Sequence, residues 1–241
     1  IMIGLIKKAV IADHLATIVN PLFADIGAMS PEQAWIAAYT FGFQIYFDFS
    51  GYSDMAMGLA YLLGFRLVIN FKTPYLSANP SEFWGRWHIS LSQWIRDYVY
   101  IGLGGNRKGI PRTYVNLMAA MLISGLWHGA AWHFVAWGAV HGLLQIIHKW
   151  SLPLNRFEWI NRLRQSWPYR IAAVCVFFHI VTWTWVFFRA ESMSGAWQMT
   201  KLMLHVDIAA LLAQPLSLLV IALYGLHLFE WLIREHEGAS S

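Results

Sequence analysis

Long apolar stretches separated by short polar segments dominate this chain. The main stretches cover residues 2–19, 33–49, 55–65, 113–148, 169–188 and 208–233. None of them alternates apolar and polar residues in the way that is typical of a half-buried β-strand. Several are long enough to cross much of a bilayer as helices. The pattern therefore predicts an all-α membrane protein, a bundle of transmembrane, re-entrant and in-plane amphipathic helices.

Capping and proline signals predict where the first helices begin and end. The pair Asn20-Pro21 should end the first helix, because the pyrrolidine ring cannot continue the hydrogen-bonding pattern. Ser30 is expected to cap the next helix, since serine is a preferred N-cap and Pro31 suits the first helical position.

The helix that follows residue 30 is expected to break between Asp48 and Asp54. Lipid cannot satisfy two carboxylates, so this segment should be broken helix buried in protein or lining a wet cavity. The plainer interpretation is that Ser50 and Asp54 only cap helix ends.

Residues 81–98 predict an amphipathic helix at the membrane interface. Aromatic and aliphatic residues recur there at steps of three and four, with polar residues between them. Residues 100–111 are glycine-rich and basic, but they lack the strand and the Lys-Ser/Thr ending of a phosphate-binding loop. We expect a connector.

The thirty-six residues 113–148 carry no Asp, Glu, Lys or Arg. One helix of that length would measure about 54 Å, against roughly 30 Å for the hydrocarbon core of a bilayer. The run should bend back near Gly125 and Gly129. The spacing of these two glycines, and of Gly138 and Gly142, also allows close helix packing.

The hairpin would place two basic segments, residues 107–112 and 156–170, on one side of the membrane. The positive-inside rule makes that side cytoplasmic. Residues 169–188 predict a spanning helix, and residues 208–233, which contain Pro215, predict a last one. We expect a single membrane domain over residues 1–241.

Composition agrees with this class. Hydrophobic residues make up 58% of the chain and charged residues 12%, about half the charged fraction of a typical soluble domain. The net charge of +4 indicates membrane anchoring rather than nucleic-acid binding, because the basic residues sit in short loops. The single Cys175 excludes an internal disulfide. The chain starts in what reads as mid-helix, so we expect a piece of a longer protein.

Histidines inside the uncharged run are the sharpest functional candidates, since a polar group there needs a partner or a task. His128 lies at the expected turn. His133, His141 and His148 fall within about 80° on one helix, which interhelical hydrogen bonds explain well. His179 is also expected to be bonded between helices. No set of three ligands has metal-binding spacing, so we expect no metal site.

Four blocks of residues closely resemble the membrane-bound O-acyltransferase family. They cover residues 44–56, 82–91 and 103–109 and the motif Gly125-Leu126-Trp127-His128-Gly129, and the similarity extends from about residue 7 to 191. Within the family, the members that acetylate alginate-like exopolysaccharide are the most similar. The resemblance implies a multi-pass fold with a funnel, and several further helices before residue 1.

The resemblance also implies roles for single residues. His128 matches the family's invariant histidine, and His88 matches a second family histidine; both are predicted catalytic residues. The same blocks supply candidates for substrate contact, namely Trp87, Trp127, Asp48, Asp54, Asn106 and Arg107.

The implied reaction moves an acetyl group from a cytoplasmic thioester toward a polysaccharide hydroxyl. A neutral imidazole can take the hydroxyl proton, which is worth about 10²–10⁴ in rate. The donor is expected to be acetyl-coenzyme A or another acyl thioester, with no bound cofactor. Expected partners are periplasmic polysaccharide O-acetylation proteins, the glycan acceptor and the lipid bilayer of the bacterial inner membrane, with no nucleic acid.

A transporter or proton-relay protein is the alternative. It would use Asp48, Asp54 and the histidine stripe as a titratable path. Inverted repeats, which are typical of transporters, are not visible in the sequence.

Overall fold

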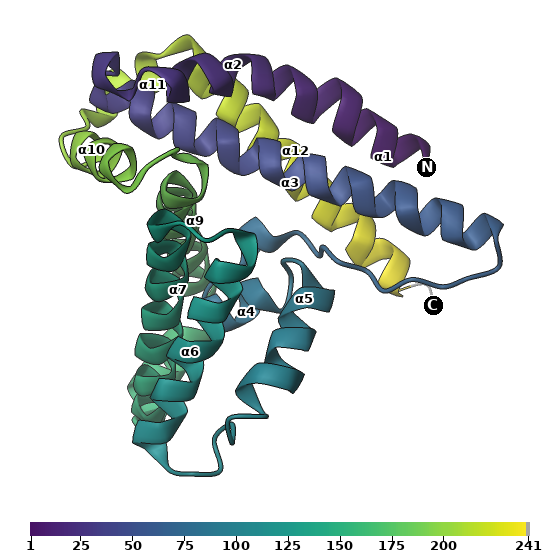
Figure 1. Cartoon of the computed structure of the whole chain (residues 1–241), viewed down its shortest axis with the longest axis vertical. Helices are drawn as coiled ribbons and strands as arrows, with labels where there is room; N and C mark the ends of the chain where they lie inside the picture. The colour runs from purple at the N-terminus through teal and green to yellow at the C-terminus, as the bar shows by residue number, and fades with distance from the viewer. Residues whose placement is uncertain (240–241) are drawn as a thin grey trace. The chain divides into compact units, whose positions relative to one another are not determined.

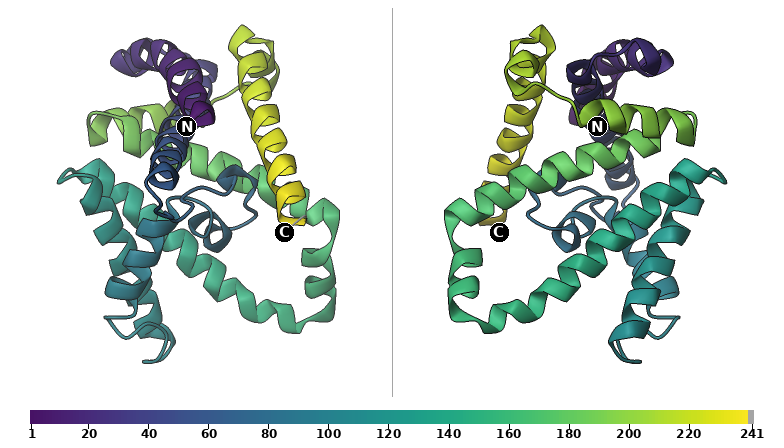
Figure 2. Two further views of the ribbon diagram at one scale, coloured as in Figure 1. Left: turned by 90° about the vertical axis from the view of Figure 1, so that its right-hand side faces the viewer. Right: turned by 90° about the vertical axis from the view of Figure 1, so that its left-hand side faces the viewer.

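The computed structural model describes the backbone of residues 1–239 and the side chains of residues 1–233. Within this range the regular elements are helices, without a β-strand, which confirms the all-α class. The chain forms two compact units (Figures 1 and 2). The first unit comprises residues 1–73 and the residues from Arg189 onward; the second comprises Pro74–Phe188.

The first unit begins with a rod made of three consecutive helical segments. These are α1 (Met2–Leu5), the π-helix η1 (Ile6–Ala12) and α2 (Asp13–Ala24). The prediction that Pro21 ends this helix is wrong, since Pro21 lies inside α2. The apolar face of α2, with Leu15, Val19 and Phe23, stays buried, and its packing offsets the one backbone hydrogen bond that proline removes.

Helix α3 (Pro31–Leu62) runs beside this rod (Figure 1). Its start confirms the prediction, because Ser30 and Gln33 form a reciprocal capping box. The predicted break between Asp48 and Asp54 is wrong, and Ser50 is buried within the continuous helix rather than capping an end.

Two lysines explain why α3 does not break. Lys7 Nζ lies 2.8 Å from Asp54, and Lys8 Nζ lies 2.5 Å from Asp48. The rod can approach closely because a Cβ on Gly51 would come within 2.8 Å of the Gly4 carbonyl. Cations from the neighbouring rod thus satisfy the carboxylates, and no irregular backbone is needed.

Lys7 also reaches the last helix, α12 (Pro215–Ala239), through a bond to Glu230. The Tyr46 hydroxyl donates to the other oxygen of Glu230 at 2.6 Å, and His227 Nδ1 lies 3.7 Å from that oxygen. Lys7 is 6% exposed, and Tyr46 and His227 are fully buried. A buried polar network therefore ties the rod, α3 and α12 together.

The remaining elements of the first unit are η2 (Ile26–Ala28), α10 (Met193–Met203) and α11 (Ile208–Ala213). Helix α10 was not predicted from the apolar pattern, because it is short and of mixed polarity. The last apolar run is divided at Pro215, with Asp207 capping α11.

The second unit contains the elements that build the candidate site. They are η3 (Pro74–Leu76), α4 (Pro80–Trp84), α5 (Ile89–Trp94), the π-helix η4 (Ile95–Tyr100), α6 (Ile110–His128), α7 (Trp132–Ser151), η5 (Leu152–Arg156), α8 (Glu158–Gln165) and α9 (Trp167–Arg189). The amphipathic helix expected over residues 81–98 is interrupted, because the backbone of His88 turns into the left-handed region at φ 42°.

Helices α6 and α7 form the predicted hairpin, lying side by side (Figure 1). The chain reverses at Gly129, one residue after α6 ends. Because the two helices are of similar length, the glycine-rich loop before α6 and the basic segment after α7 lie at the same end of the hairpin. Helix α8 joins the far ends of α7 and α9 (Figure 2). At the other end, His133 at the start of α7 contacts the carbonyl of Phe187 near the end of α9.

Glycines allow α6 and α7 to touch through their backbones. A Cβ on Gly125 would lie 2.3 Å from the Phe134 carbonyl oxygen, and one on Gly138 would lie 2.4 Å from that of Met121. Since both obstructing atoms belong to the backbone, neither helix can yield without moving apart.

Replacing Gly125 with alanine is therefore expected to destabilise the protein by about 1–3 kcal/mol, the usual effect of overpacking. Gly225→Ala in α12 is the matched control, because nothing lies within 4 Å of its added Cβ. Alanine is the better helix former, so the control should be neutral or stabilising by up to about 1 kcal/mol. Thermal unfolding of the full-length protein in detergent measures both; equal effects would contradict the close packing.

Two described helices are long and apolar enough to cross a membrane by length and composition, Trp167–Arg189 and Pro215–Ile233. Both were predicted as spanning helices. Their aliphatic side chains suit contact with lipid, since Ile171, Val176 and Leu218 are at least 60% exposed.

Candidate functional site

His128 is the last residue of α6 and lies in a box of aromatic rings. Its ring centroid is 5.0 Å from that of Trp127, 4.8 Å from Phe188, 5.4 Å from Trp137 and 6.3 Å from Phe134. These rings come from α6, α7 and α9, so three helices shape the surroundings of one imidazole. The side chain is half-buried, which leaves it reachable from one side.

Gly129 completes this arrangement for a steric reason. A Cβ at this position would come within 2.7 Å of the Phe134 ring. The absence of a side chain lets Phe134 lie beside His128 where the hairpin turns. The glycine that follows the histidine is thus part of the site's construction.

His88 lies near His128, although forty residues separate them in sequence. The rings of His88 and Trp127 are 6.1 Å apart, and Trp127 in turn contacts His128. Burial, with a smaller contribution from the proximity of His128, lowers the pKa of His88 to about 4. The His88 imidazole is therefore neutral at physiological pH and can act as a hydrogen-bond donor or acceptor.

The backbone of His88 has φ 42° and ψ 57°, a conformation that is unusual for residues other than glycine, asparagine and aspartate. It separates α4 from α5 and redirects the chain at the point where the ring reaches Trp127. Such a conformation persists only when the surrounding structure maintains it, and it often marks a functional position.

Two histidines of the predicted stripe are hydrogen-bonded to α9, whereas the third, His148, lines a cavity elsewhere in the second unit. His133 Nδ1 lies 2.9 Å from the Phe187 carbonyl, and His141 Nε2 lies 3.1 Å from Thr184 Oγ1. This confirms interhelical bonding for these two. His179 differs, because it is exposed and its Nδ1 bonds to the Cys175 carbonyl of its own helix.

The contacts of His141 fix its tautomer. The Thr184 hydroxyl donates to the Val181 carbonyl at 2.7 Å, so its oxygen must accept from His141 Nε2–H. The Nδ1 atom of His141 then carries a lone pair. His141 is fully buried and packs against Trp137 and, edge to face, against Trp84, which connects it to the aromatic box around His128.

Trp87 is predicted to contact substrate but lies in the core next to the site. It is 5% exposed, stacks on Phe83 and lies 4.9 Å from Trp185 between ring centroids. Trp87 therefore packs behind the aromatic rings of the site, and its own ring presents almost no surface. Trp127, in contrast, is 60% exposed beside both histidines and remains a candidate for substrate contact.

Asn106 and Arg107 are not near His128. They lie in the exposed turn before α6, whereas His128 ends α6, about 27 Å further along the helix axis. The two residues therefore lie apart from the histidines, and their contact with substrate stays a prediction. The loop contributes to the fold instead, because Asn116 Nδ2 donates to the carbonyls of Gly105 and Leu103.

Asp48 and Asp54 belong to the first unit and are each paired with a lysine there. Ion pairing accounts for both carboxylates. Among residues 1–233, no group of three or more His, Cys, Asp or Glu side chains has the arrangement of a metal site.

Sequence reasoning missed the aromatic walls contributed by Phe134, Trp137 and Phe188. Phe188 is sixty residues from His128 and belongs to a helix that reads as an ordinary membrane span. No local signal marks it, because its role follows from the way α9 returns to the hairpin.

Chemically, the site offers a half-buried imidazole, a second neutral imidazole and walls that lack charged side chains. An imidazole can accept a proton from an attacking hydroxyl. Apolar walls keep water from a reactive ester or thioester. This combination suits acyl transfer to a hydroxyl group.

Comparisons with known proteins agree with this chemistry. The family model of the membrane-bound O-acyltransferases matches residues 1–219. A probable alginate O-acetylase of Azotobacter vinelandii is 44% identical over 95% of the chain. A peptidoglycan O-acetyltransferase of Helicobacter pylori is 40% identical over 85%, and a teichoic acid D-alanyltransferase of Streptococcus thermophilus is 35% identical over 69%.

The chain covers 46%, 38% and 42% of the lengths of these three relatives. It thus spans less than half of each.

Proposed function

Because the chain belongs to the membrane-bound O-acyltransferase family, we propose that the full-length protein transfers an acyl group to a hydroxyl with His128 as general base. The observation that carries the proposal is the pairing of His128 and His88 across Trp127 inside an uncharged aromatic box. The imidazole would take the proton as the hydroxyl oxygen attacks the carbonyl carbon of a thioester, and the thiol would leave.

His88 is assigned a second role in the proposal. A neutral imidazole with an N–H can stabilise the negative charge that develops on the carbonyl oxygen. The lowered pKa of His88, to about 4, keeps this group uncharged throughout the physiological range. The two histidines would thus divide proton removal and charge stabilisation between them.

The proposed substrates follow from the relatives. Two of the three are named for O-acetylation of a polymer, alginate and peptidoglycan. We extend this to an acetyl group delivered to an exopolysaccharide hydroxyl, with acetyl-coenzyme A or another cytoplasmic thioester as the donor. Periplasmic O-acetylation proteins would act as partners, in a multi-pass protein of the bacterial inner membrane.

The direct test uses membranes that contain the full-length protein. Radiolabelled acetyl-coenzyme A is added, and label transferred to polysaccharide is measured against membranes without the protein. Protein-dependent label on the polymer supports the proposal. Label that is independent of the protein contradicts it for this donor, and the same assay with an acyl carrier thioester tests the other donor class.

Two replacements at His88 separate its chemistry from its backbone role. Asparagine tolerates the left-handed conformation, whereas alanine tolerates it less well. His88→Asn should therefore fold normally and still lose about 10²-fold in kcat, because the shorter amide does not bring its N–H to the position of the imidazole Nε2–H. His88→Ala should lose activity and stability together. Wild-type kcat in His88→Asn would show that the imidazole is not needed.

The transport alternative gains no support from the residues it invoked. Asp48 and Asp54 are ion-paired, and His133 and His141 are hydrogen-bonded to α9. Packing accounts for all four groups.

A further inference from the structure

A cavity in the second unit lies apart from His88 and His128, although His148 is among the residues that line it. It has a volume of about 440 Å³ and lies between α4, α5 and η4 on one side and the α6–α7 hairpin on the other. This volume is within the range of roughly 300–1,000 Å³ that is typical of small-molecule sites. Neither His88 nor His128 lines it.

The interior of the cavity is largely apolar. Its walls include Ile89, Ile95, Leu117, Ala120, Met121 and Leu152. Trp84 also belongs to the wall. A ligand would therefore need a hydrocarbon portion.

The charged residues that line the cavity are both basic, Arg96 and Lys149. Arg96 is bonded to Asp97, at 2.7 Å from its Nε. No ion pair or hydrogen bond within the described part of the chain engages the Lys149 ammonium. The cation at Lys149 is thus available to an anionic group of a ligand.

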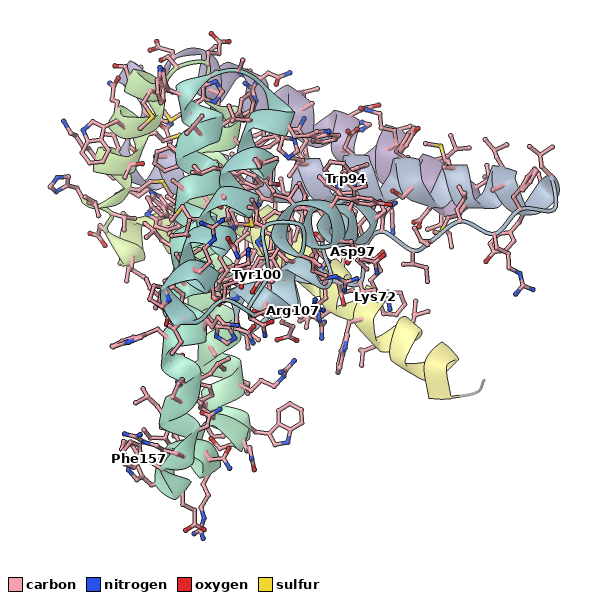
Figure 3. All side chains as sticks on the ribbon, turned by 60° about the horizontal axis from the view of Figure 1, so that its bottom comes forward. Lys72, Trp94, Asp97, Tyr100, Arg107 and Phe157 are labelled. Carbon is pink, nitrogen blue, oxygen red and sulfur yellow. The ribbon has the colours of Figure 1, made fainter. Side chains whose placement is uncertain are left out.

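Exposed aromatic residues stand close in sequence to residues that line the cavity. Trp94, Tyr98 and Trp150 are 50%, 71% and 69% exposed. Figure 3 labels Trp94, Asp97 and Tyr100 on the α5–η4 helix, from which they project to different sides. Exposed tryptophan and tyrosine are typical of the headgroup level of a membrane. The basic residues of the cavity, Arg96 and Lys149, would then lie at the level where lipid phosphates are concentrated.

We propose that this cavity binds an anionic phospholipid, with the phosphate at Lys149 and an acyl chain between the apolar walls. Basic pockets between membrane helices are known to hold acidic lipid headgroups. A bound lipid would fill the space between the interfacial helix and the hairpin, and so support the helix that follows His88. The inference does not depend on the proposed acyl transfer.

The test measures lipid binding to the purified full-length protein. Delipidated protein is titrated with short-chain phosphatidylglycerol and with short-chain phosphatidylcholine, and bound lipid is counted by native mass spectrometry. We expect phosphatidylglycerol to be preferred. Lys149→Ala should weaken that preference about fivefold, corresponding to roughly 1 kcal/mol per basic group near the headgroup.

Two further variants make the outcome decisive. Lys108→Ala removes a basic residue from the exposed loop at the same end of the hairpin and should leave binding unchanged, since Lys108 does not line the cavity. Ala120→Leu adds volume inside the cavity and should reduce binding of both lipids.

Three results would overturn the proposal. One is equal binding of the two lipids, and another is binding that is unaffected by Lys149→Ala and Ala120→Leu in folded protein. The third is displacement of phosphatidylglycerol by acetyl-coenzyme A at matched concentration, which would assign the cavity to the acyl donor.

Discussion

Replacing His128 with alanine is expected to reduce acyl transfer by about 10²–10⁴-fold, the usual contribution of a positioned general base. The loss should appear in kcat, because the imidazole acts on the proton in the transition state rather than on substrate binding. The measurement is transfer of radiolabelled acetyl to polysaccharide by the full-length protein. Transfer near the wild-type rate would remove His128 as the base.

A matched control is His133→Gln. His133 lies near the start of α7, 8% exposed, and its ring bonds to the Phe187 carbonyl. Glutamine can keep a hydrogen bond to that carbonyl, so this variant should retain most of the transfer rate. If His128→Ala and His133→Gln lose activity equally, then damage to packing explains both. If only the first loses it, while both variants show similar thermal unfolding, the chemical role of His128 stands.

Replacing Lys7 with methionine is expected to destabilise the protein by about 3–5 kcal/mol. Its ammonium satisfies two carboxylates, those of Asp54 and Glu230, and all three side chains are at most 17% exposed. Removing one partner of a buried ion pair leaves charge that neither water nor protein compensates. Thermal unfolding in detergent and the yield of folded protein in membranes measure the loss.

The neighbouring Lys8 provides the control. It also pairs with carboxylates, Asp13 and Asp48, but its side chain is 42% exposed. Exposed pairs contribute about 0–1 kcal/mol, so Lys8→Met should be nearly neutral. Combining Lys7→Met with Asp54→Asn and Glu230→Gln should restore much of the stability, since no charge is then left unpaired. Equal effects of the two lysine variants would contradict the buried network.

The features that the sequence predicted correctly share a local cause. Ser30 caps a helix because its own side chain bonds the first turn, and the chain reverses at Gly129, where a side chain would collide with Phe134 five residues away. In each case the determining atoms lie within a few residues of one another.

The errors arose where distant residues decide the outcome. Asp48 and Asp54 read as a helix break, because nothing near them in sequence shows that Lys7 and Lys8 lie opposite. The motif that contains Arg107 likewise carried no information on the roughly 27 Å of helix that separates it from His128. Ion pairs with a neighbouring helix keep α3 continuous, and the length of α6 separates Arg107 from His128. Local propensity contains neither kind of information.

The contacts between the first rod and α3 also fix their alignment along the chain. Ile1 lies against Gly58, Gly4 against Gly51, and Lys8 reaches Asp48, so the two run antiparallel. Sliding by one turn, about 5.4 Å, would bring larger residues opposite Gly4 and separate both lysines from their carboxylates. An inserted residue between Gly4 and Lys7 would turn Lys7 by about 100° and face it toward lipid. An insertion or deletion between Gly4 and Lys8 should therefore abolish this alignment, and one within α2 should turn Leu15, Val19 and Phe23 out of their buried face.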